Sequence, residues 1–169
     1  YNRMKRALII GCTMVFTAAT AMAQDFVSKY MQENKQDTVL HCISVSPKMM
    51  EEVLKIDSQK GNEEEMRSIM ANLKSMQIVS SKTNGDFYFN KAEEIIEKNA
   101  NRFEPFLSFN DRNENCRIMV RKKEKTIIEL VMFSHKEDSF QVINFTGNMN
   151  DEFIDNLVKT MMPRKGDKD

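Results

Sequence analysis

Residues 116–147 read CRIMVRKKEKTIIELVMFSHKEDSFQVINFTG, three apolar runs separated by two short polar segments. Alternate residues of a strand point to opposite faces, so each run can place an apolar set on one side. Those sets are Ile118 and Val120, then Ile128, Leu130 and Met132, and finally Ile143 and Phe145. The polar segments, residues 122–125 and 135–139, are short enough to be hairpin loops. The stretch therefore predicts an antiparallel three-stranded meander with an apolar face that helices must cover.

Residues outside the meander supply the helices and two more strands. Apolar residues spaced three and four apart predict helices that begin near residues 24, 47, 62, 90 and 151. Alternating runs over 38–46 and 77–81 predict strands. Because strands and helices do not alternate strictly along the chain, the pattern indicates an α+β fold. We expect two layers, with the helices packed on one face of a mostly antiparallel sheet.

The first residues have the three-part pattern of a secretory signal. A basic start at residues 4–6 precedes an apolar run over 7–19, and Ala21 and Ala23 flank Met22 at the point of cleavage. The apolar run is shorter than the ~20 residues that span a membrane. We therefore expect residues 4–23 to be a signal peptide, 24–162 to be one domain and 163–169 to be a disordered tail. Export would place the protein in the periplasm or cell envelope.

A second interpretation of the N-terminus concerns Cys12. The sequence Ile9-Ile10-Gly11-Cys12 resembles the site at which lipoproteins are lipidated. The apolar segment before this cysteine is shorter than the ~7–15 residue core of a signal peptide, so cleavage after Ala23 is favoured. Membrane attachment would follow only from lipidation of Cys12.

The charge balance argues against a nucleic-acid partner. The chain has 25 basic and 25 acidic residues, and cleavage after Ala23 removes three basic ones, which leaves a net charge of about −3. Proteins that bind nucleic acid neutralise phosphates with an excess of Lys and Arg. Two cysteines, Cys42 and Cys116, remain after cleavage. They are too few for a disulfide scaffold, and the sequence leaves open whether they pair.

The sequence has no motif of a known catalytic chemistry. It lacks the glycine-rich phosphate loop, the zinc-protease helix and the serine-hydrolase elbow. Its acidic pairs fall near predicted helix starts, where the helix dipole favours negative charge. The methionines fall on helix stripes, where they suit core packing better than a soft-metal site. We therefore expect no enzymatic activity, no catalytic residue, no metal site and no cofactor.

Two residues keep an enzymatic alternative open. Glu129 lies in the middle of a predicted strand between apolar neighbours, and a buried carboxylate there could be functional. Its simpler role is an ion pair with a basic residue of the neighbouring strand: Arg117, Arg121 or Lys123. His41 lies in the strand predicted over 38–46. The alternative function is a small envelope enzyme with a pocket around Glu129 or His41.

The second face of the meander carries a further apolar set, which helices on the first face would leave open. Its members are Met119, Ile127, Val131, Phe133, Phe140 and Val142. An open face with that much apolar surface usually marks a partner or dimer site. The sequence therefore predicts a non-catalytic interaction module that binds an unidentified envelope protein or a second copy of itself.

Several segments, taken in order, resemble one protein family. They are Phe26 and Tyr30 after the signal, SVSPKMM at 44–50, LKSMQIVS at 73–80, IIELVMF at 127–133 and VINFTGNM at 142–149. This succession resembles the DUF4252 family of exported Bacteroidota proteins. The resemblance implies an exported domain of unassigned molecular function and supplies no catalytic residue. Asp37-Thr38-Val39 also resembles an O-glycan attachment site of such proteins, which makes Thr38 a candidate for glycosylation.

Overall fold

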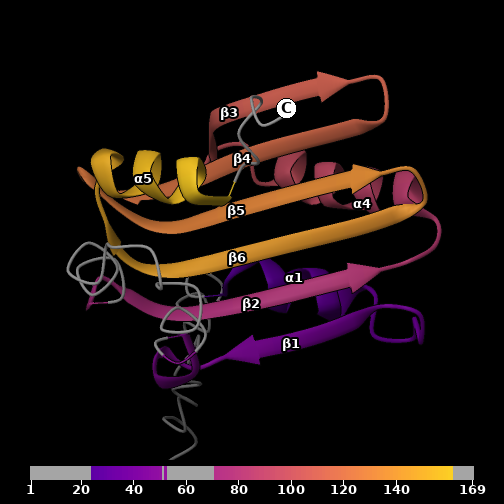
Figure 1. The fold of residues 1–169 in the computed structure, drawn as a ribbon, viewed down its shortest axis with the longest axis horizontal. Helices are drawn as coiled ribbons and strands as arrows, with labels where there is room; N and C mark the ends of the chain where they lie inside the picture. Colours follow the sequence, from indigo (N-terminus) through magenta and orange to yellow (C-terminus); the bar gives the residue numbers. More distant parts are fainter. Residues whose placement is uncertain (1–23, 51, 53–70, 162–169) are drawn as a thin grey trace, which may run out of the picture.

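A computed structural model describes residues 24–50, residue 52 and residues 71–161, with side chains up to Leu157. The regular elements are α1 (Phe26–Glu33), β1 (His41–Val45), β2 (Leu73–Ser81), α4 (Gly85–Lys98), β3 (Glu104–Asp111), β4 (Glu114–Lys123), β5 (Thr126–Lys136), β6 (Ser139–Met149) and α5 (Asp151–Met161) (Figure 1). This content confirms the α+β class. The signal peptide and the tail predicted from the sequence lie outside the described residues.

The six strands of the described residues form one antiparallel sheet in the order β1-β2-β6-β5-β4-β3. Strands β4, β5 and β6 follow one another along the chain and pair with each other through short loops at residues 124–125 and 137–138. Glu124 and Glu137 have φ angles of 58° and 53°, which allow these tight reversals. Strand β2 pairs with the free edge of β6 and thereby joins the N-terminal part of the chain to the meander.

Several element boundaries differ from the sequence prediction. The segment after Pro105 forms an additional strand, β3, and proline is tolerated there because β3 lies at the edge of the sheet. Strand β2 begins at Leu73, four residues before the strand predicted over 77–81. Helix α4 begins at Gly85, five residues before the expected Asn90, directly after Asn84 in the left-handed conformation. Most of the helix predicted from residue 62 lies outside the described residues.

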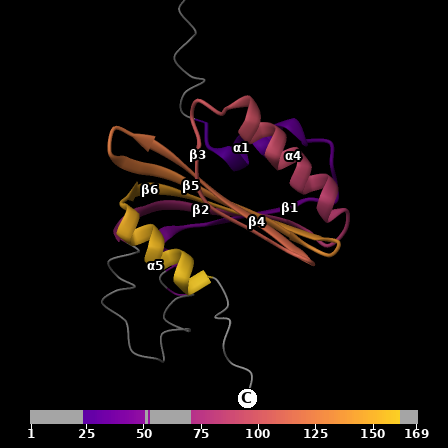
Figure 2. The ribbon, with the colours of Figure 1, turned by 90° about the horizontal axis from the view of Figure 1, so that it is seen from above.

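The helices cover both faces of the sheet, so the predicted two-layer arrangement is wrong. Helices α1 and α4 lie on one face and α5 lies on the other (Figure 2). The face under α1 and α4 has a core rich in Phe and Tyr, here called the aromatic core. The opposite face packs Ile, Leu, Val and Met against α5, here called the aliphatic core. A sheet that is apolar on both faces must be covered on both.

The predicted interaction face is therefore not open. Its six side chains are at most 3% exposed: Met119, Ile127, Val131, Phe133, Phe140 and Val142. Five of them belong to the aromatic core beneath α1 and α4. Ile127 belongs to the aliphatic core, because a β-bulge between Ile127 and Glu129 changes the alternation of β5. The prediction failed because it assigned every helix to the same side.

Within the residues that the structure describes, no helix is both long enough and apolar enough to cross a membrane.

Candidate functional site

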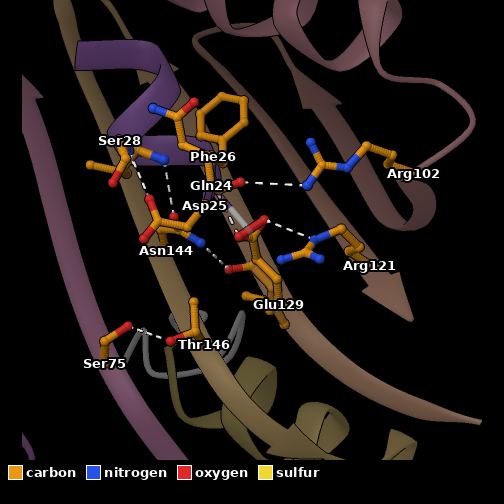
Figure 3. A network of polar contacts seen from close by, with 12 residues as sticks. Gln24, Asp25, Phe26, Ser28, Ser75, Arg102, Arg121, Glu129, Asn144 and Thr146 are labelled. Carbon is orange, nitrogen blue, oxygen red and sulfur yellow. Dashed lines mark hydrogen bonds and ion pairs between the residues drawn. The ribbon is translucent and has the colours of Figure 1, made fainter. Parts of the chain in front are cut away.

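Glu129, the carboxylate singled out from the sequence, is fully buried beneath the start of α1. The register of β4 and β5 places it opposite Arg121, whose Nε lies 3.5 Å from Glu129 Oε1. The backbone N–H of Phe26 donates to the other carboxylate oxygen at 3.3 Å (Figure 3). Of the three basic partners that the sequence suggested, the structure thus selects Arg121.

Asn144 on β6 completes the attachment of α1 to the sheet. The N–H of Val27 donates to Asn144 Oδ1 at 3.0 Å, and Asn144 Nδ2 donates to the carbonyl of Leu130 at 3.3 Å. The next amide, of Ser28, donates to the N-cap side chain of Asp25 at 2.7 Å. The first turn of a helix has N–H groups without helical partners, and here three side chains accept from them. Glu129 and Asn144 therefore hold the N-terminus of α1 on the aromatic core.

The electrostatics of Glu129 follow from this position. Burial raises the pKa of the carboxyl, while the Arg121 guanidinium and the Phe26 N–H act in the opposite direction. Glu129 Oε1 and Arg121 Nε are buried and lack a hydrogen-bond partner among the described residues. Because the side chain is 0% exposed, a substrate cannot reach it in this conformation. The arrangement positions a helix and offers no open catalytic carboxylate.

His41 and Glu129 do not form a common site. His41 is exposed on the edge strand β1, and strands β2 and β6 separate it from β5. Thr38 is exposed in the loop before β1, next to Asp37. The Tyr88 hydroxyl donates to Asp37 at 2.7 Å and lowers the pKa of that carboxyl. Thr38 thus remains a predicted glycosylation site on an accessible loop.

The two cysteines of the described residues, Cys42 and Cys116, are free. Cys42 is exposed on β1 and Cys116 is buried on β4, with three strands of the sheet between them. Neighbouring strands are about 4.8 Å apart, so four such steps separate the two residues by far more than the ~7 Å limit for a disulfide. The question that the sequence left open is thereby answered for this fold.

A polar cleft of about 510 Å³ lies between the first half of α4 and the strands β3, β4 and β5. Asp86, Asn90 and Glu93 line it from α4, where their spacing places them on one side of the helix. The strand register forms its floor in two rows. One row runs from Ser108 to Arg117, and the other contains Asn110, Asn115 and His135.

The start of α4 packs closely against the sheet at this cleft. A Cβ atom added at Gly85 would lie 2.7 Å from the carbonyl oxygen of Ser139, which is closer than real Cβ atoms approach. The absence of a side chain therefore lets α4 begin against the β5–β6 loop. From there the helix lies mainly over β5 and β6. This placement makes its polar side the wall of the cleft.

The charged side chains of the cleft are paired with each other. Arg117 Nη1 donates to Glu93 Oε1 at 2.8 Å, and both side chains are 31% exposed. His135 Nε2 lies 3.3 Å from Asp86 Oδ1 and 2.8 Å from Asn115 Nδ2. The His135 ring also packs edge-on against Phe89. Arg117 and Glu93 thus form an ion pair, while the carboxylate of Asp86 lies beside the His135 ring.

Two buried polar atoms in the cleft lining have no hydrogen-bond partner among the described residues. They are Asn115 Oδ1 and His135 Nδ1. Asn115 Oδ1 is an acceptor, and His135 Nδ1 is a donor or an acceptor according to the tautomer of the ring. Buried groups of this kind are rare in folded proteins, and each requires an explanation.

The lining provides hydrogen-bonding groups and no nucleophile–base pair. Within the described part of the chain, no hydroxyl or thiol is hydrogen-bonded to His135. The described residues also contain no group of three or more His, Cys, Asp or Glu that could hold a metal ion. The cleft can bind a polar ligand through amides, carboxylates and a guanidinium.

Sequence reasoning missed this cleft. It placed His135 in a hairpin loop, whereas the structure places it in β5 opposite Asn115. The polar side of α4, with Asp86, Asn90 and Glu93, was the available signal. The lining residues from β3 and β4 become neighbours only through the strand register, and the sequence does not reveal this register.

Comparisons with known proteins place the chain in a family without naming an activity. No curated protein matches it. The family model described as "Domain of unknown function (DUF4252)" matches residues 30–157. This range runs from Tyr30 in α1 to Leu157 in α5 and contains all six strands. The resemblance of the sequence motifs is thereby confirmed, and the chain belongs to the DUF4252 family.

Proposed function

We propose that this protein is an exported, non-catalytic binding module of the cell envelope, and that its binding site is the cleft between α4 and β3–β5. One observation carries the proposal: Asn115 Oδ1 and His135 Nδ1 are buried without partners in the polar lining of an open cleft. A ligand with both a donor and an acceptor would supply what these two atoms lack, after a small rearrangement of the side chains.

The charge pattern argues against an anionic ligand. Glu93 already binds Arg117, the one guanidinium of the described lining, and the other charged group of that lining is the carboxylate of Asp86. The other polar side chains of the lining include amides and a hydroxyl, from Asn90, Ser108 and Asn110 among others, and Phe89, Phe109 and Cys116 complete it. Such groups recognise hydroxyl-rich or amide-rich molecules, which include sugars and peptide backbone.

The alternative of an enzyme around Glu129 or His41 has less support. Glu129 is fully buried and its carboxylate is occupied by Arg121 and the N–H of Phe26. His41 lies on an exposed edge strand, with two strands between it and β5. Neither residue lines the cleft. The binding function is therefore the better conclusion.

The cleft can be tested by site-specific photo-cross-linking in the native envelope. A benzophenone amino acid replaces Asn90 in the cleft wall, and in a matched control it replaces Glu97, which is exposed on the same helix outside the cleft. We expect a discrete adduct from position 90, none from position 97, and loss of the adduct when Asn115→Ala is added. Equal labelling from both positions, or none from either, would contradict the proposal.

Export has its own test. If the signal peptide is cleaved after Ala23, the intact mass of the secreted protein corresponds to a chain that begins at Gln24. A fatty-acylated Cys12 in the membrane fraction would instead show an anchored protein. Retention of residues 4–23 in a protein found only inside the cell would exclude export.

A further inference from the structure

The outer edge of β3 has no strand beside it among the described residues, because β3 is the last strand of the sheet (Figure 1). An edge strand presents unpaired N–H and C=O groups to any strand that can approach. The first part of β3 is protected by Pro105 and by an irregularity between Pro105 and Leu107. The second part, residues 107–110, contains neither a proline nor a charge.

This unprotected part also exposes apolar side chains. Leu107 is 39% exposed and Phe109 is 37% exposed, and both register with the aliphatic face of β4, opposite Ile118 and Cys116. Ser108 and Asn110 alternate with them on the other face, and both line the cleft, as does Phe109. The edge thus combines free backbone groups, an apolar pair on one face and small polar groups on the other.

The sequence of β3 is complementary to itself when it is read in the opposite direction. In an antiparallel pair of β3 strands with a two-fold axis at Ser108, Leu107 of one copy lies opposite Phe109 of the other, and this happens twice. Apolar cross-strand pairs of this kind stabilise an antiparallel pair of strands.

We propose that two copies of this chain pair through their β3 edges, antiparallel and with the two-fold axis at Ser108. The two six-stranded sheets then form one continuous sheet. The pairing involves β3 alone and requires no ligand. It therefore goes beyond the proposed binding function and can be tested independently of it.

The pairing would also enlarge the cleft. A two-fold axis perpendicular to the sheet keeps the α4 helices of both copies on the same side. Ser108 and Asn110 of the second copy then continue the cleft floor of the first. The two clefts become one groove with an α4 wall on each side, so each copy contributes residues to the site of the other.

Oligomeric state gives the first test. Light scattering after size-exclusion chromatography is expected to show a dimer for the unaltered protein. Phe109→Lys removes both apolar pairs and is expected to weaken the dimer by about tenfold or more. Ile43→Lys, at a 56% exposed residue of the other edge strand, is the matched control and is expected to leave the dimer intact. A monomer at every concentration, or a dimer broken by Ile43→Lys, would overturn the proposal.

Cross-linking tests the register. In a Cys42→Ser background, Ser108→Cys places two thiols opposite each other at the axis. Directly opposed residues of antiparallel strands have Cα atoms about 4.5–5.5 Å apart, which suits a disulfide. Asn110→Cys is the control, because in this register it faces Phe106 of the other copy. Oxidation is expected to link Ser108→Cys only; efficient linkage of Asn110→Cys, or of native Cys42 in the unaltered chain, would show a different interface.

Discussion

The two faces of the sheet hold their helices in different ways. On the aromatic core, α1 is fixed by stacked rings of Phe26, Tyr30, Phe133 and Phe140 and by polar bonds to Glu129 and Asn144. On the aliphatic core, the described side chains of α5 contribute Phe153, Ile154 and Leu157. Among the described residues, no charged side chain is buried in the aliphatic core. On the side of the aromatic core, one charged side chain is buried, that of Glu129.

This difference separates two roles of a buried contact. Apolar burial supplies most of the free energy of folding but tolerates small shifts of the packed element. A hydrogen bond from a specific amide to a buried carboxylate is lost when the helix moves by one residue. We infer that the aliphatic core mainly stabilises the sheet, whereas the aromatic core also specifies where α1 lies.

The largest expected effect comes from removing two rings of the aromatic core. Phe133→Ser combined with Phe140→Ser should unfold the domain, because each loss of a buried Phe costs about 3–5 kcal/mol and a typical domain has about 5–15 kcal/mol in total. Circular dichroism melting measures the outcome. The control is Leu107→Ser with Phe109→Ser on the exposed edge, which should leave the fold intact. A double Phe variant that melts like the unaltered protein would show that this face is not a core.

Loss of the buried carboxylate should have the next largest effect. Glu129→Ala leaves Arg121 as an unpaired, largely buried charge and the Phe26 N–H without an acceptor, so we expect a loss of about 3–5 kcal/mol in the free energy of unfolding. Urea unfolding measures it. Leu130→Ala is the neighbouring control in the aliphatic core and should destabilise without selectively loosening α1.

A second change tests the cause of this loss. Adding Arg121→Met to Glu129→Ala should recover part of the stability, because the unpaired charge is then gone. The loss in the free energy of unfolding of the double variant is compared with the sum of the losses in Glu129→Ala and Arg121→Met. If the two are equal, the two side chains contribute to stability independently of each other.

Asn144→Ala tests a polar attachment of α1 to the sheet that involves no charged group. It removes the acceptor for the Val27 N–H and a donor to the Leu130 carbonyl, and we expect a cost of about 1–3 kcal/mol. Hydrogen exchange should accelerate at the first amides of α1 and stay unchanged in α5. Gln141→Ala, at an exposed residue of the same strand, should change neither measurement. Equal acceleration in both helices would remove the distinction between the two cores.

The pH dependence of stability provides a smaller effect with a defined sign. Burial raises the pKa of Glu129 above its ordinary 4.5, so the folded state holds this proton more tightly than the unfolded state. The stability of the protein relative to Glu129→Gln should therefore fall as pH rises from 4.5 through the raised pKa. Urea titrations of both proteins over this range measure the difference. For Ile118→Val in the aliphatic core, the difference from the unaltered protein should be independent of pH.

The cysteines should give the smallest effect. Reducing agent should leave the melting temperature unchanged, because Cys42 and Cys116 lie on strands too far apart to pair. A thiol reagent should label Cys42 in the folded protein and Cys116 only after unfolding, since burial raises the pKa of the Cys116 thiol to about 11. A fall of tens of degrees on reduction would require a disulfide and a different sheet.

Local sequence patterns predicted the elements better than their assembly. Alternation located β4, β5 and β6, and apolar spacing located α1 and α5, because these signals involve residues close together in the chain. The side of the sheet on which α5 packs depends on contacts that no local pattern contains. One clue was available: Leu130 and Val131 are both apolar yet point to opposite faces, so both faces needed cover.

The sequence could predict neither the bulge in β5 nor the edge strand β3, for related reasons. Alternation through Ile127 and Glu129 looks regular in the sequence, so the extra residue that moves Ile127 to the other core has no local sign. Pro105 suggested the end of a helix but could not indicate that a strand would begin beside it. The cleft required the positions of β3, β4, β5 and α4 together, which explains why none of its residues was proposed as a site.

The attachment of α1 also sets an order in time. Proteins are synthesised from the N-terminus, yet the acceptors for the Phe26 and Val27 amides lie 103 and 117 residues further along the chain. At about 5–20 residues per second, α1 leaves the ribosome roughly 5–20 s before the Glu129 that holds it. During that interval its Phe and Tyr side chains have no core to enter, which makes the first helix a natural segment for a chaperone to hold until β5 and β6 arrive.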